Sequence, residues 1–319
     1  MSPPLLEALP PSVEIVEVGP RDGLQREPVL STEAKLALIQ GLVDAGLRTI
    51  QVTAFVHPRR VPQMADAEAL CRRLPQVEGV VFTGLALNLR GVERAVQAGG
   101  IQAVDVSVSA NEDHSRRNAN RSVDQALAEM VQMVALARSH GLQVRGGIQC
   151  AFGYRRPDDV SSERVRELAD TILAMGVDQL ALADSAGLAD PRSLFRRVAP
   201  LVEQAHPVPV VLHLHDTRGL GLANLLAGLA CGVRAFDTAF GGLGGCPFID
   251  GAAGNIATED TVHMLHRMGI ATGVDPVQVA RVSLQAREAL GRGDLPSRIA
   301  ALVERAPDRV ELSPSEMAP

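Results

Sequence analysis

The 319-residue sequence lacks any long hydrophobic run. Its longest apolar stretches, such as Val210–Leu212 and Leu225–Leu229, fall far short of the roughly 20 residues that cross a bilayer. The first residues, Met1–Pro11, contain no basic region followed by an apolar stretch, so we expect no secretory signal. These absences argue against a membrane-spanning or a secreted protein.

Paired cysteines and basic runs are missing as well. The four cysteines have no CxxC spacing, which argues against a structural zinc site or a disulfide framework. The net charge is −6, and no basic run is dense enough to indicate a nucleic-acid partner. The first predicted strand is not followed by the Gly-rich GxGxxG sequence of dinucleotide-binding sheets. We therefore expect a cytoplasmic protein that binds neither nucleic acid nor membrane.

What the sequence does contain is a repeated alternation of strands and helices. Apolar, β-branched stretches recur at intervals of roughly 25–40 residues, with 3.6-residue periodicity between them. Each stretch is short and almost continuously apolar, as expected of a strand buried on both faces. The predicted strands are Glu14–Val18, Thr49–Phe55, Val80–Leu87, Val104–Ser109, Val144–Ala151, Gln179–Ala183, Val210–His213 and Ala235–Phe240.

Eight such units favour a closed barrel over an open sheet, although length alone fits one large barrel or two ordinary domains. We predict an α/β fold, a (β/α)8 TIM barrel over about residues 13–273. The clearest helices between strands are Thr32–Ala45 and Ser122–His140. The whole chain, residues 1–319, is predicted to form a single catalytic domain.

A helical extension is predicted to follow the barrel. The patterns Glu259–Met268 and Pro276–Leu290 predict helices, and the C-terminal helices should occupy about residues 274–303. The tail, residues 304–319, is rich in proline, serine and charge, which predicts a loose segment.

Polar residues gather where the predicted strands end, and catalytic groups of such barrels lie at those carboxyl ends. The first strand leads into Arg21 and Asp22, and the seventh ends at His213 and His215. Residues two apart on a strand point to the same face, so both histidines should face one site. Two histidines on one face at a strand end favour metal ligands over structural residues.

Closure of the barrel should bring the ends of the seventh, eighth and first strands together. Asp22 and Asn255, which follows the eighth strand, can then complete a set of two nitrogens and two oxygens with the histidines. Such a set without thiolates favours Mg2+ or Mn2+ and leaves positions open for substrate oxygens. Asn is also a favoured helix N-cap, so a capping role for Asn255 remains an alternative.

Arg21 and Cys246 are candidates for direct catalytic roles. Arg21 can hold the barrel mouth in an ion pair with Asp22 or stabilise an oxyanion near the metal, and its position at the strand end favours the second role. Cys246 sits among four glycines. That setting suits a lid that carries one reactive group over bound substrate. We therefore predict a catalytic rather than an inert thiol.

These motifs resemble the 3-hydroxy-3-methylglutaryl-CoA lyase family. The resemblance covers about Val13 to Gly273 and rests on Val16–Gln25, Val61–Met64, His213–Thr217, Gly241–Pro247 and Gly254–Asp260. It implies a divalent cation bound by Asp22, His213, His215 and Asn255, and catalytic roles for Arg21, Asp22, His213 and Cys246. It also implies a substrate site formed by Arg21, Gln25, Gln51, Asn118, Ser122, Arg145 and Asp184.

The resemblance implies a metal-dependent carbon–carbon lyase acting on a 3-hydroxyacyl-CoA. The leading substrate is 3-hydroxy-3-methylglutaryl-CoA, cleaved to acetyl-CoA and acetoacetate as in leucine degradation, by a homo-oligomer (a dimer or higher). The same chemistry on another thioester, such as citramalyl-CoA, is one alternative. A second alternative is a Claisen-type condensing acyltransferase, and the cysteine-bearing glycine loop argues against it. A third is a non-catalytic paralogue that binds an acyl-CoA, and the retention of all four ligand types argues against that.

Three segments depart from the family pattern. Gln51 stands where the family usually has Glu, and it should lie close to Arg21 and the metal. Ala183–Ser185 replaces Gly-Asp-Thr, and Ala110–Ser115 replaces a Ser-Glu-x-x-Ser pattern. If the missing carboxylate serves chemistry common to all substrates, the protein should be a slow lyase. If it serves recognition, another thioester should be preferred, and the changes in the other two segments favour recognition.

Overall fold

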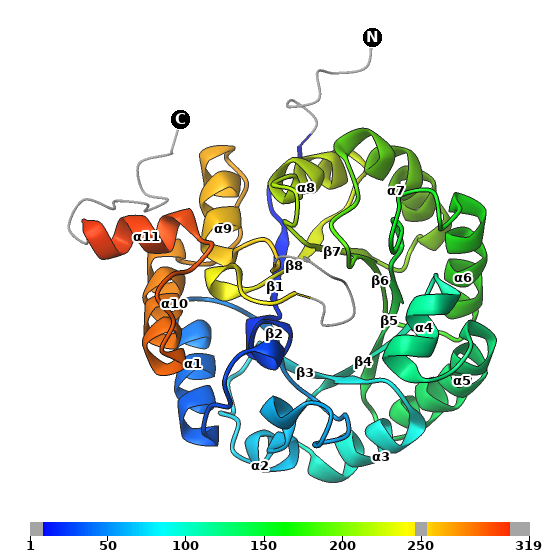
Figure 1. Cartoon of the computed structure of the whole chain (residues 1–319), viewed down its shortest axis with the longest axis horizontal. Coiled ribbons are helices and arrows are strands. Elements are labelled where there is room, and N and C mark those ends of the chain that lie inside the picture. The colour runs from blue at the N-terminus through cyan, green and yellow to red at the C-terminus, as the bar shows by residue number, and fades with distance from the viewer. Residues whose placement is uncertain (1–8, 246–253, 307–319) are drawn as a thin grey trace.

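The computed structural model describes residues 9–245 and 254–306, within which parallel strands close into a barrel (Figure 1). The strands follow chain order around the barrel, and β1 pairs with both β2 and β8. The predicted (β/α)8 barrel is therefore confirmed. The strands are β1 (Glu14–Glu17), β2 (Thr49–Ala54), β3 (Val81–Ala86), β4 (Ala103–Ser109), β5 (Gln143–Gln149), β6 (Gln179–Asp184), β7 (Val210–Leu214) and β8 (Ala235–Thr238).

Helices surround the barrel, and several of them begin at capping residues that the sequence offers. Ser31 accepts a hydrogen bond from the Ala34 N–H at the start of α1, and Ser122 forms a capping box with Gln125 at the start of α5. The helices are α1 (Thr32–Asp44), α2 (Ala67–Cys71), α3 (Leu89–Ala98), α4 (Glu112–Ala119), α5 (Val123–Ser139), α6 (Ser162–Ala174), α7 (Pro191–Ala205), α8 (Gly221–Ala230), α9 (Thr258–Arg267), α10 (Pro276–Leu290) and α11 (Arg298–Arg305).

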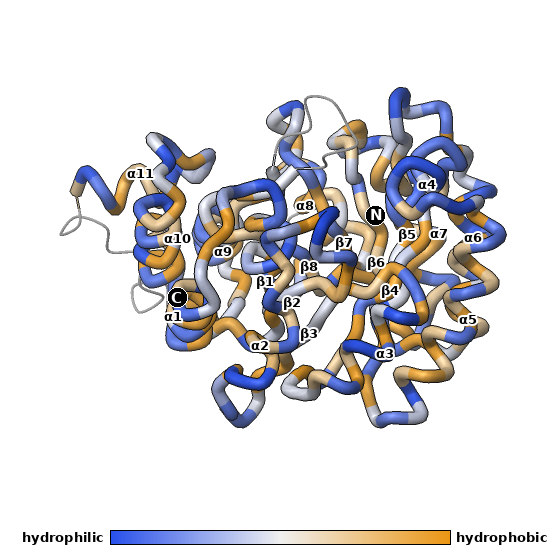
Figure 2. Tube along the Cα trace, turned by 60° about the horizontal axis from the view of Figure 1, so that its bottom comes forward, coloured by the Kyte–Doolittle hydropathy of each residue, from blue (hydrophilic) through white to orange (hydrophobic). Residues whose placement is uncertain are grey.

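The main hydrophobic core lies between the barrel and its ring of helices. Strands β2, β4 and β7 are buried along nearly their whole length, which explains their continuous apolar sequences. Hydrophobic segments occupy the strands and the helix faces turned toward them (Figure 2). Phe55, Phe82 and Phe236 are among the largest fully buried side chains. This packing holds the strand ends, and the polar residues that follow them, at fixed positions.

The C-terminal helices extend the barrel on the side of β1 (Figure 1). Helix α10 packs against α1 and α9, and α11 packs against α10. The predicted loose tail begins too early, because α11 continues to Arg305. There Glu304 forms an ion pair of 2.6 Å with Arg287 of α10, which holds the last turn. Residues 307–319 lie outside the described part of the chain.

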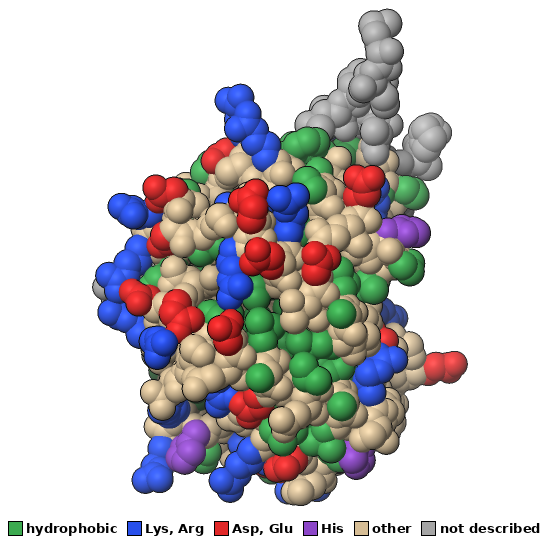
Figure 3. Space-filling view, turned by 90° about the vertical axis from the view of Figure 1, so that its right-hand side faces the viewer, with side chains coloured by type: hydrophobic (Ala, Val, Ile, Leu, Met, Phe, Trp, Pro, Cys, Tyr) green, Lys and Arg blue, Asp and Glu red, His purple; other side chains and the backbone are tan. Residues whose placement is uncertain are grey.

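No helix in the described part of the chain has both the length and the apolar character needed to span a membrane. On the side of the barrel where α5 and α6 lie, acidic and basic side chains are interspersed (Figure 3). That face therefore carries no large area of a single charge.

Candidate active site and metal centre

A cavity of about 620 Å³ lies at the carboxyl ends of the barrel strands. This is where the barrel architecture predicts a site. The predicted residues that line it are Arg21, Asp22, Gln25, Gln51, Asn118, Arg145, His213 and His215. Sequence reasoning assigned no role to Asp105, Ser107, His114, Gln149 and Asp237, which line the same cavity.

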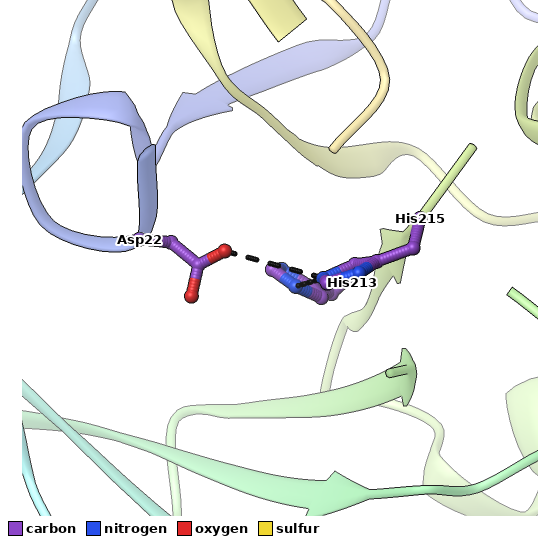
Figure 4. Close-up of side chains that lie close together, drawn as sticks. All are labelled: Asp22, His213 and His215. Carbon is purple, nitrogen blue, oxygen red and sulfur yellow. Dashed lines mark hydrogen bonds and ion pairs between the residues drawn. The ribbon is translucent and has the colours of Figure 1, made fainter. Parts of the chain in front are cut away.

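Three of the predicted metal ligands converge in this cavity (Figure 4). One ligand atom each of Asp22, His213 and His215 lies within 4.8 Å of the other two, and all three residues are buried. The Nε2 atoms of the two histidines are 3.1 Å apart. An Asp22 carboxylate oxygen lies 4.0 Å from the His215 Nε2. One cation can therefore be reached by all three side chains.

Asn255, the fourth predicted ligand, lies beside Asp22 in the segment after β8. Its backbone pairs with His215, and its amide nitrogen donates to Asp22 Oδ2 at 2.7 Å. Its side-chain oxygen is buried and accepts no hydrogen bond from any described residue. The alternative that Asn255 caps the next helix is wrong, because α9 begins at Thr258 with Ala257 as its N-cap.

The four side chains fit a divalent cation. A buried polar oxygen without a donor is costly in a folded protein, and a cation would satisfy the Asn255 oxygen. Two imidazole nitrogens, a carboxylate and an amide oxygen form a donor set that suits Mg2+ or Mn2+. Gly244 lets the backbone pass beside them, because a Cβ there would lie 2.5 Å from the Asn255 amide nitrogen.

The orientation of His213 is set by Asp237, a residue that sequence analysis missed. The two residues are register partners on β7 and β8, and an Asp237 oxygen lies 3.0 Å from His213 Nδ1. Burial would raise the pKa of Asp237, but the charge of Arg145 and its contacts with His213 lower it below the usual range. An ionised Asp237 accepts a hydrogen bond from Nδ1–H of His213, which keeps the proton on Nδ1 and leaves the lone pair of Nε2 for a metal. The sequence signal that could have pointed to Asp237 is an acidic residue inside an otherwise apolar strand.

Asp22 is presented by a π-helical turn, Gly19–Gly23, directly after β1. The Asp22 N–H donates to the Val18 carbonyl at 2.6 Å. Its carboxylate accepts hydrogen bonds from Arg21 at 2.6 Å and from Gln25 at 2.9 Å. Burial would raise the pKa of Asp22, but the charges of Arg21 and the two histidines lower it to about 2. The carboxylate is therefore ionised and ready to bind a cation at neutral pH.

A chain of hydrogen bonds crosses the barrel from Arg21 to His213. Arg21 Nε donates to Gln51 Oε1, and Gln51 Nε2 donates to Asp105 Oδ2. Arg145 then donates to Asp105 at 2.7 Å and to Asp237 at 2.6 Å. The expected proximity of Gln51 to Arg21 is confirmed. Arg145 thus forms two ion pairs, through Nε with Asp105 and through Nη1 with Asp237.

Asn118 reaches the cavity through a second polar chain. Its amide nitrogen donates to Gln149 at 2.9 Å, and the Gln149 amide donates to the Ser107 hydroxyl at 2.9 Å. Asn118 is on α4, whereas Gln149 and Ser107 come from β5 and β4. This chain gives one wall of the cavity a polar lining.

Two other predicted substrate residues do not line the cavity. Asp184 is fully buried at the end of β6 and accepts the N–H groups of Leu188 and Ala189 at 2.8 and 3.0 Å. Burial raises its pKa above the usual value. Ser122 caps α5. Asp184 and Ser122 thus hold a turn and a helix end, and Cys246 lies outside the described residues.

A buried carboxyl group, Glu17, connects the Arg21–Asp22 turn to the segment after β8. It accepts hydrogen bonds from the N–H groups of Gly19 and Phe240 at 2.6 and 3.0 Å and from the Thr258 hydroxyl at 2.6 Å. Burial raises the pKa of Glu17 from 4.5 to about 8. Burial likewise raises the pKa of the neighbouring Glu259 to about 7.

The free energy of unfolding should therefore fall as the pH rises from about 4.5 to about 8, because only the folded state keeps these protons in that window. We expect Glu17→Gln, which mimics the protonated form, to flatten this dependence in urea unfolding between pH 5 and 8.5. In the Glu17→Gln variant, Glu259 should still cause a smaller decrease of the unfolding free energy with pH. Glu14→Gln, at an exposed position of the same strand, is the control. An unchanged slope in Glu17→Gln would contradict this account.

Comparison with known proteins gives a consistent picture. The HMGL-like family model matches residues 12–285. The chain is 40% identical over 275 residues to the cytoplasmic 3-hydroxy-3-methylglutaryl-CoA lyase of Mus musculus, covering 86% of this chain and 80% of the relative. It is 39% identical over 290 residues to the hydroxymethylglutaryl-CoA lyase YngG of Bacillus subtilis, covering 91% and 96%.

Solved structures agree with the sequence comparison. The crystal structure of the Bacillus subtilis HMG-CoA lyase matches with a TM-score of 0.88 at 37% identity, over 93% of this chain and 99% of that one. An HMG-CoA lyase from Acinetobacter baumannii, in complex with coenzyme A and 3-methylmalate, matches with a TM-score of 0.88 at 34% identity, over 95% and 97%. Because the family model spans most of the chain and both relatives match more than four fifths of it, the chain belongs to the HMGL-like family, as its motifs predicted.

Proposed function

We propose that the protein is a divalent-metal-dependent carbon–carbon lyase that cleaves a 3-hydroxyacyl-CoA. The first candidate substrate is 3-hydroxy-3-methylglutaryl-CoA, which would give acetyl-CoA and acetoacetate. The observation that carries this proposal is the cluster of Asp22, His213 and His215 beside Arg21 at the wall of a large cavity. Its relatives are HMG-CoA lyases, and one of them was solved with coenzyme A and 3-methylmalate.

The cation would be held by Asp22, His213, His215 and Asn255. When bound, it would supply Lewis-acid chemistry that lowers the pKa of the substrate's 3-hydroxyl group. The protein prepares this site in advance, because Asp237 orients His213 while Arg21 and Gln25 hold the Asp22 carboxylate.

Arg21 would stabilise the charge that develops on the thioester oxygen when the C2–C3 bond breaks. Its guanidinium group is anchored by Gln51 at Nε and by Asp22 at Nη1, so it needs little reorganisation during the reaction. His213 would act as a ligand rather than as a general base, because Asp237 engages Nδ1 and Nε2 faces the ligand cluster. The proposed role of Cys246, donation of a proton to the resulting enolate, rests on the family resemblance.

Turnover of a thioester panel tests the proposed function. With Mg2+ or Mn2+ present, the protein should release acetyl-CoA from 3-hydroxy-3-methylglutaryl-CoA or from a related thioester such as citramalyl-CoA, as measured by chromatography. Binding of these thioesters in calorimetry without turnover of any of them would instead indicate a non-catalytic paralogue. Release of free coenzyme A from acetyl-CoA and an oxo acid would indicate a condensing acyltransferase.

Residues 1–319 would act as one catalytic domain in a cytoplasmic homo-oligomer, a dimer or higher. The mouse relative is a cytoplasmic enzyme. Light scattering coupled to size-exclusion chromatography measures the oligomeric state directly.

A further inference from the structure

The side-chain amide of Gln51 has only one orientation that satisfies its two neighbours. Gln51 is fully buried between Arg21 and Asp105. An arginine can only donate hydrogen bonds, and an ionised carboxylate can only accept them. The Gln51 oxygen must therefore face Arg21, and its amide nitrogen must face Asp105. A neutral amide is the side chain that fits between a donor and an acceptor.

Asp105 is held in place on its other sides as well. The Thr83 hydroxyl donates to Oδ2 at 2.9 Å, and Arg145 Nε donates to Oδ1 at 2.7 Å. Asp105 and Arg145 are register partners on β4 and β5, so the backbone sets this pairing. The direction of each hydrogen bond from Arg145 to Arg21 is thus determined by the charged groups along the chain.

A glutamate at position 51 would disturb this arrangement. It could accept from Arg21, but its second oxygen would face Oδ2 of Asp105. Two carboxylates in contact repel each other, and no hydrogen lies between them. A glutamate at position 51 is therefore incompatible with an ionised carboxylate at position 105, and a neutral hydrogen-bond donor there would remove the conflict.

We propose that Asp105 is a positioning residue for Arg21, acting through Gln51, and that positions 51 and 105 together accommodate one carboxylate. This chain places that carboxylate at position 105. The proposal deepens the lyase function and rests on it, because the group being positioned is the proposed oxyanion-stabilising arginine. The replacement of the family's glutamate by Gln51 then reflects its neighbour, and neither lost chemistry nor a new substrate is needed to explain it.

A double-mutant cycle on these two positions tests the proposal. Gln51→Glu brings two acceptors together. In Asp105→Asn the one remaining oxygen faces the charged Arg145, which brings two amide donors together at position 51. Each single variant therefore breaks the link between position 105 and position 51, and with it the connection from Asp105 to Arg21. In the double variant, the new amide nitrogen at position 105 would donate to the new carboxylate at position 51. That carboxylate would accept from Arg21, and the new amide oxygen at position 105 would accept from Arg145. The links from Arg145 through positions 105 and 51 to Arg21 are restored, with the carboxylate moved from position 105 to position 51. The Thr83 hydroxyl, which donates to Asp105 Oδ2 in the wild type, would rotate to accept from the new amide nitrogen.

We expect each single variant to lose about 10- to 100-fold in kcat with little change in KM, because Arg21 acts on charge that develops in the transition state. The double variant should return to within about fivefold of the wild type. Gln102→Glu is the matched control. Gln102 precedes β4 at the opposite end of the barrel, where its oxygen accepts from the Phe82 N–H, so kcat should stay unchanged.

The free energy of unfolding of all four proteins provides a readout that needs no activity. Rescue in both kcat and stability supports the proposal. Rescue of stability alone would show that the pair is only structural, and that outcome overturns the positioning role. Losses that multiply in the double variant, or a Gln51→Glu protein as active as the wild type, also overturn it. If no thioester is turned over, the proposed function fails, whereas coupling in stability still reports whether the two positions share one carboxylate.

Discussion

Replacing His213 with alanine should abolish divalent-cation binding and lyase turnover while the barrel stays folded. The Nε2 atom of His213 faces the cluster with Asp22 and His215, so its loss removes one ligand of a proposed set of four. Asp237 keeps its ion pair with Arg145 at 2.6 Å, so the variant leaves no unpaired charge at that position. Asp22→Ala should have the same effect on the metal. Treatment of the wild type with a chelator should likewise remove activity, and Mg2+ or Mn2+ should restore it.

Metal content by mass spectrometry and Mn2+ titration by calorimetry provide the measurement. His266→Ala is the matched control, because His266 bonds to Thr272 at 2.9 Å and does not line the cavity. It should retain both metal and turnover. If either His213→Ala or Asp22→Ala binds metal at the wild-type stoichiometry, the assigned ligand set is wrong.

Replacing Arg21 with methionine should lower kcat by about 100- to 1,000-fold, the usual cost of removing one oxyanion-stabilising donor. KM should change much less, because the charge that Arg21 opposes develops in the transition state. Arg21→Lys should recover only part of the rate. A lysine keeps one positive charge but lacks the planar group that reaches both Gln51 and Asp22.

Steady-state kinetics and metal content together separate Arg21 from the metal ligands, since Arg21→Met should still bind the cation. Arg94→Met is a suitable control. Arg94 is a half-buried arginine on α3 that pairs with Glu68 at 2.6 Å and does not line the cavity. It should lower stability without lowering kcat. A rise in KM at normal kcat in Arg21→Met would assign Arg21 to substrate binding instead.

Much of the fold could be predicted because it depends on local patterns. The strands are short apolar runs, since both faces of a parallel barrel strand are buried, and each predicted strand overlaps an observed one. Helix α5 begins after Ser122 because that side chain caps it. The histidine pair follows from the two-residue period of a strand. Cys246 stays a prediction.

The neighbours of the site residues could not be read from local patterns. Periodicity shows which face a side chain takes, but not which residue it meets on the next strand. The register of β7 with β8 places Asp237 beside His213, and that of β4 with β5 places Asp105 beside Arg145. Sequence reasoning accordingly missed both aspartates.

The sequence by itself thus determined the barrel, the strand ends that carry the polar residues and the four candidate ligands. Only the tertiary structure decided how those residues are supported. It placed Ala257 rather than Asn255 at the start of α9, and it placed Gln51 between Arg21 and Asp105. The physical reason is that hydrogen bonds and charges at this site act between strands far apart in sequence, so their partners depend on barrel closure and register.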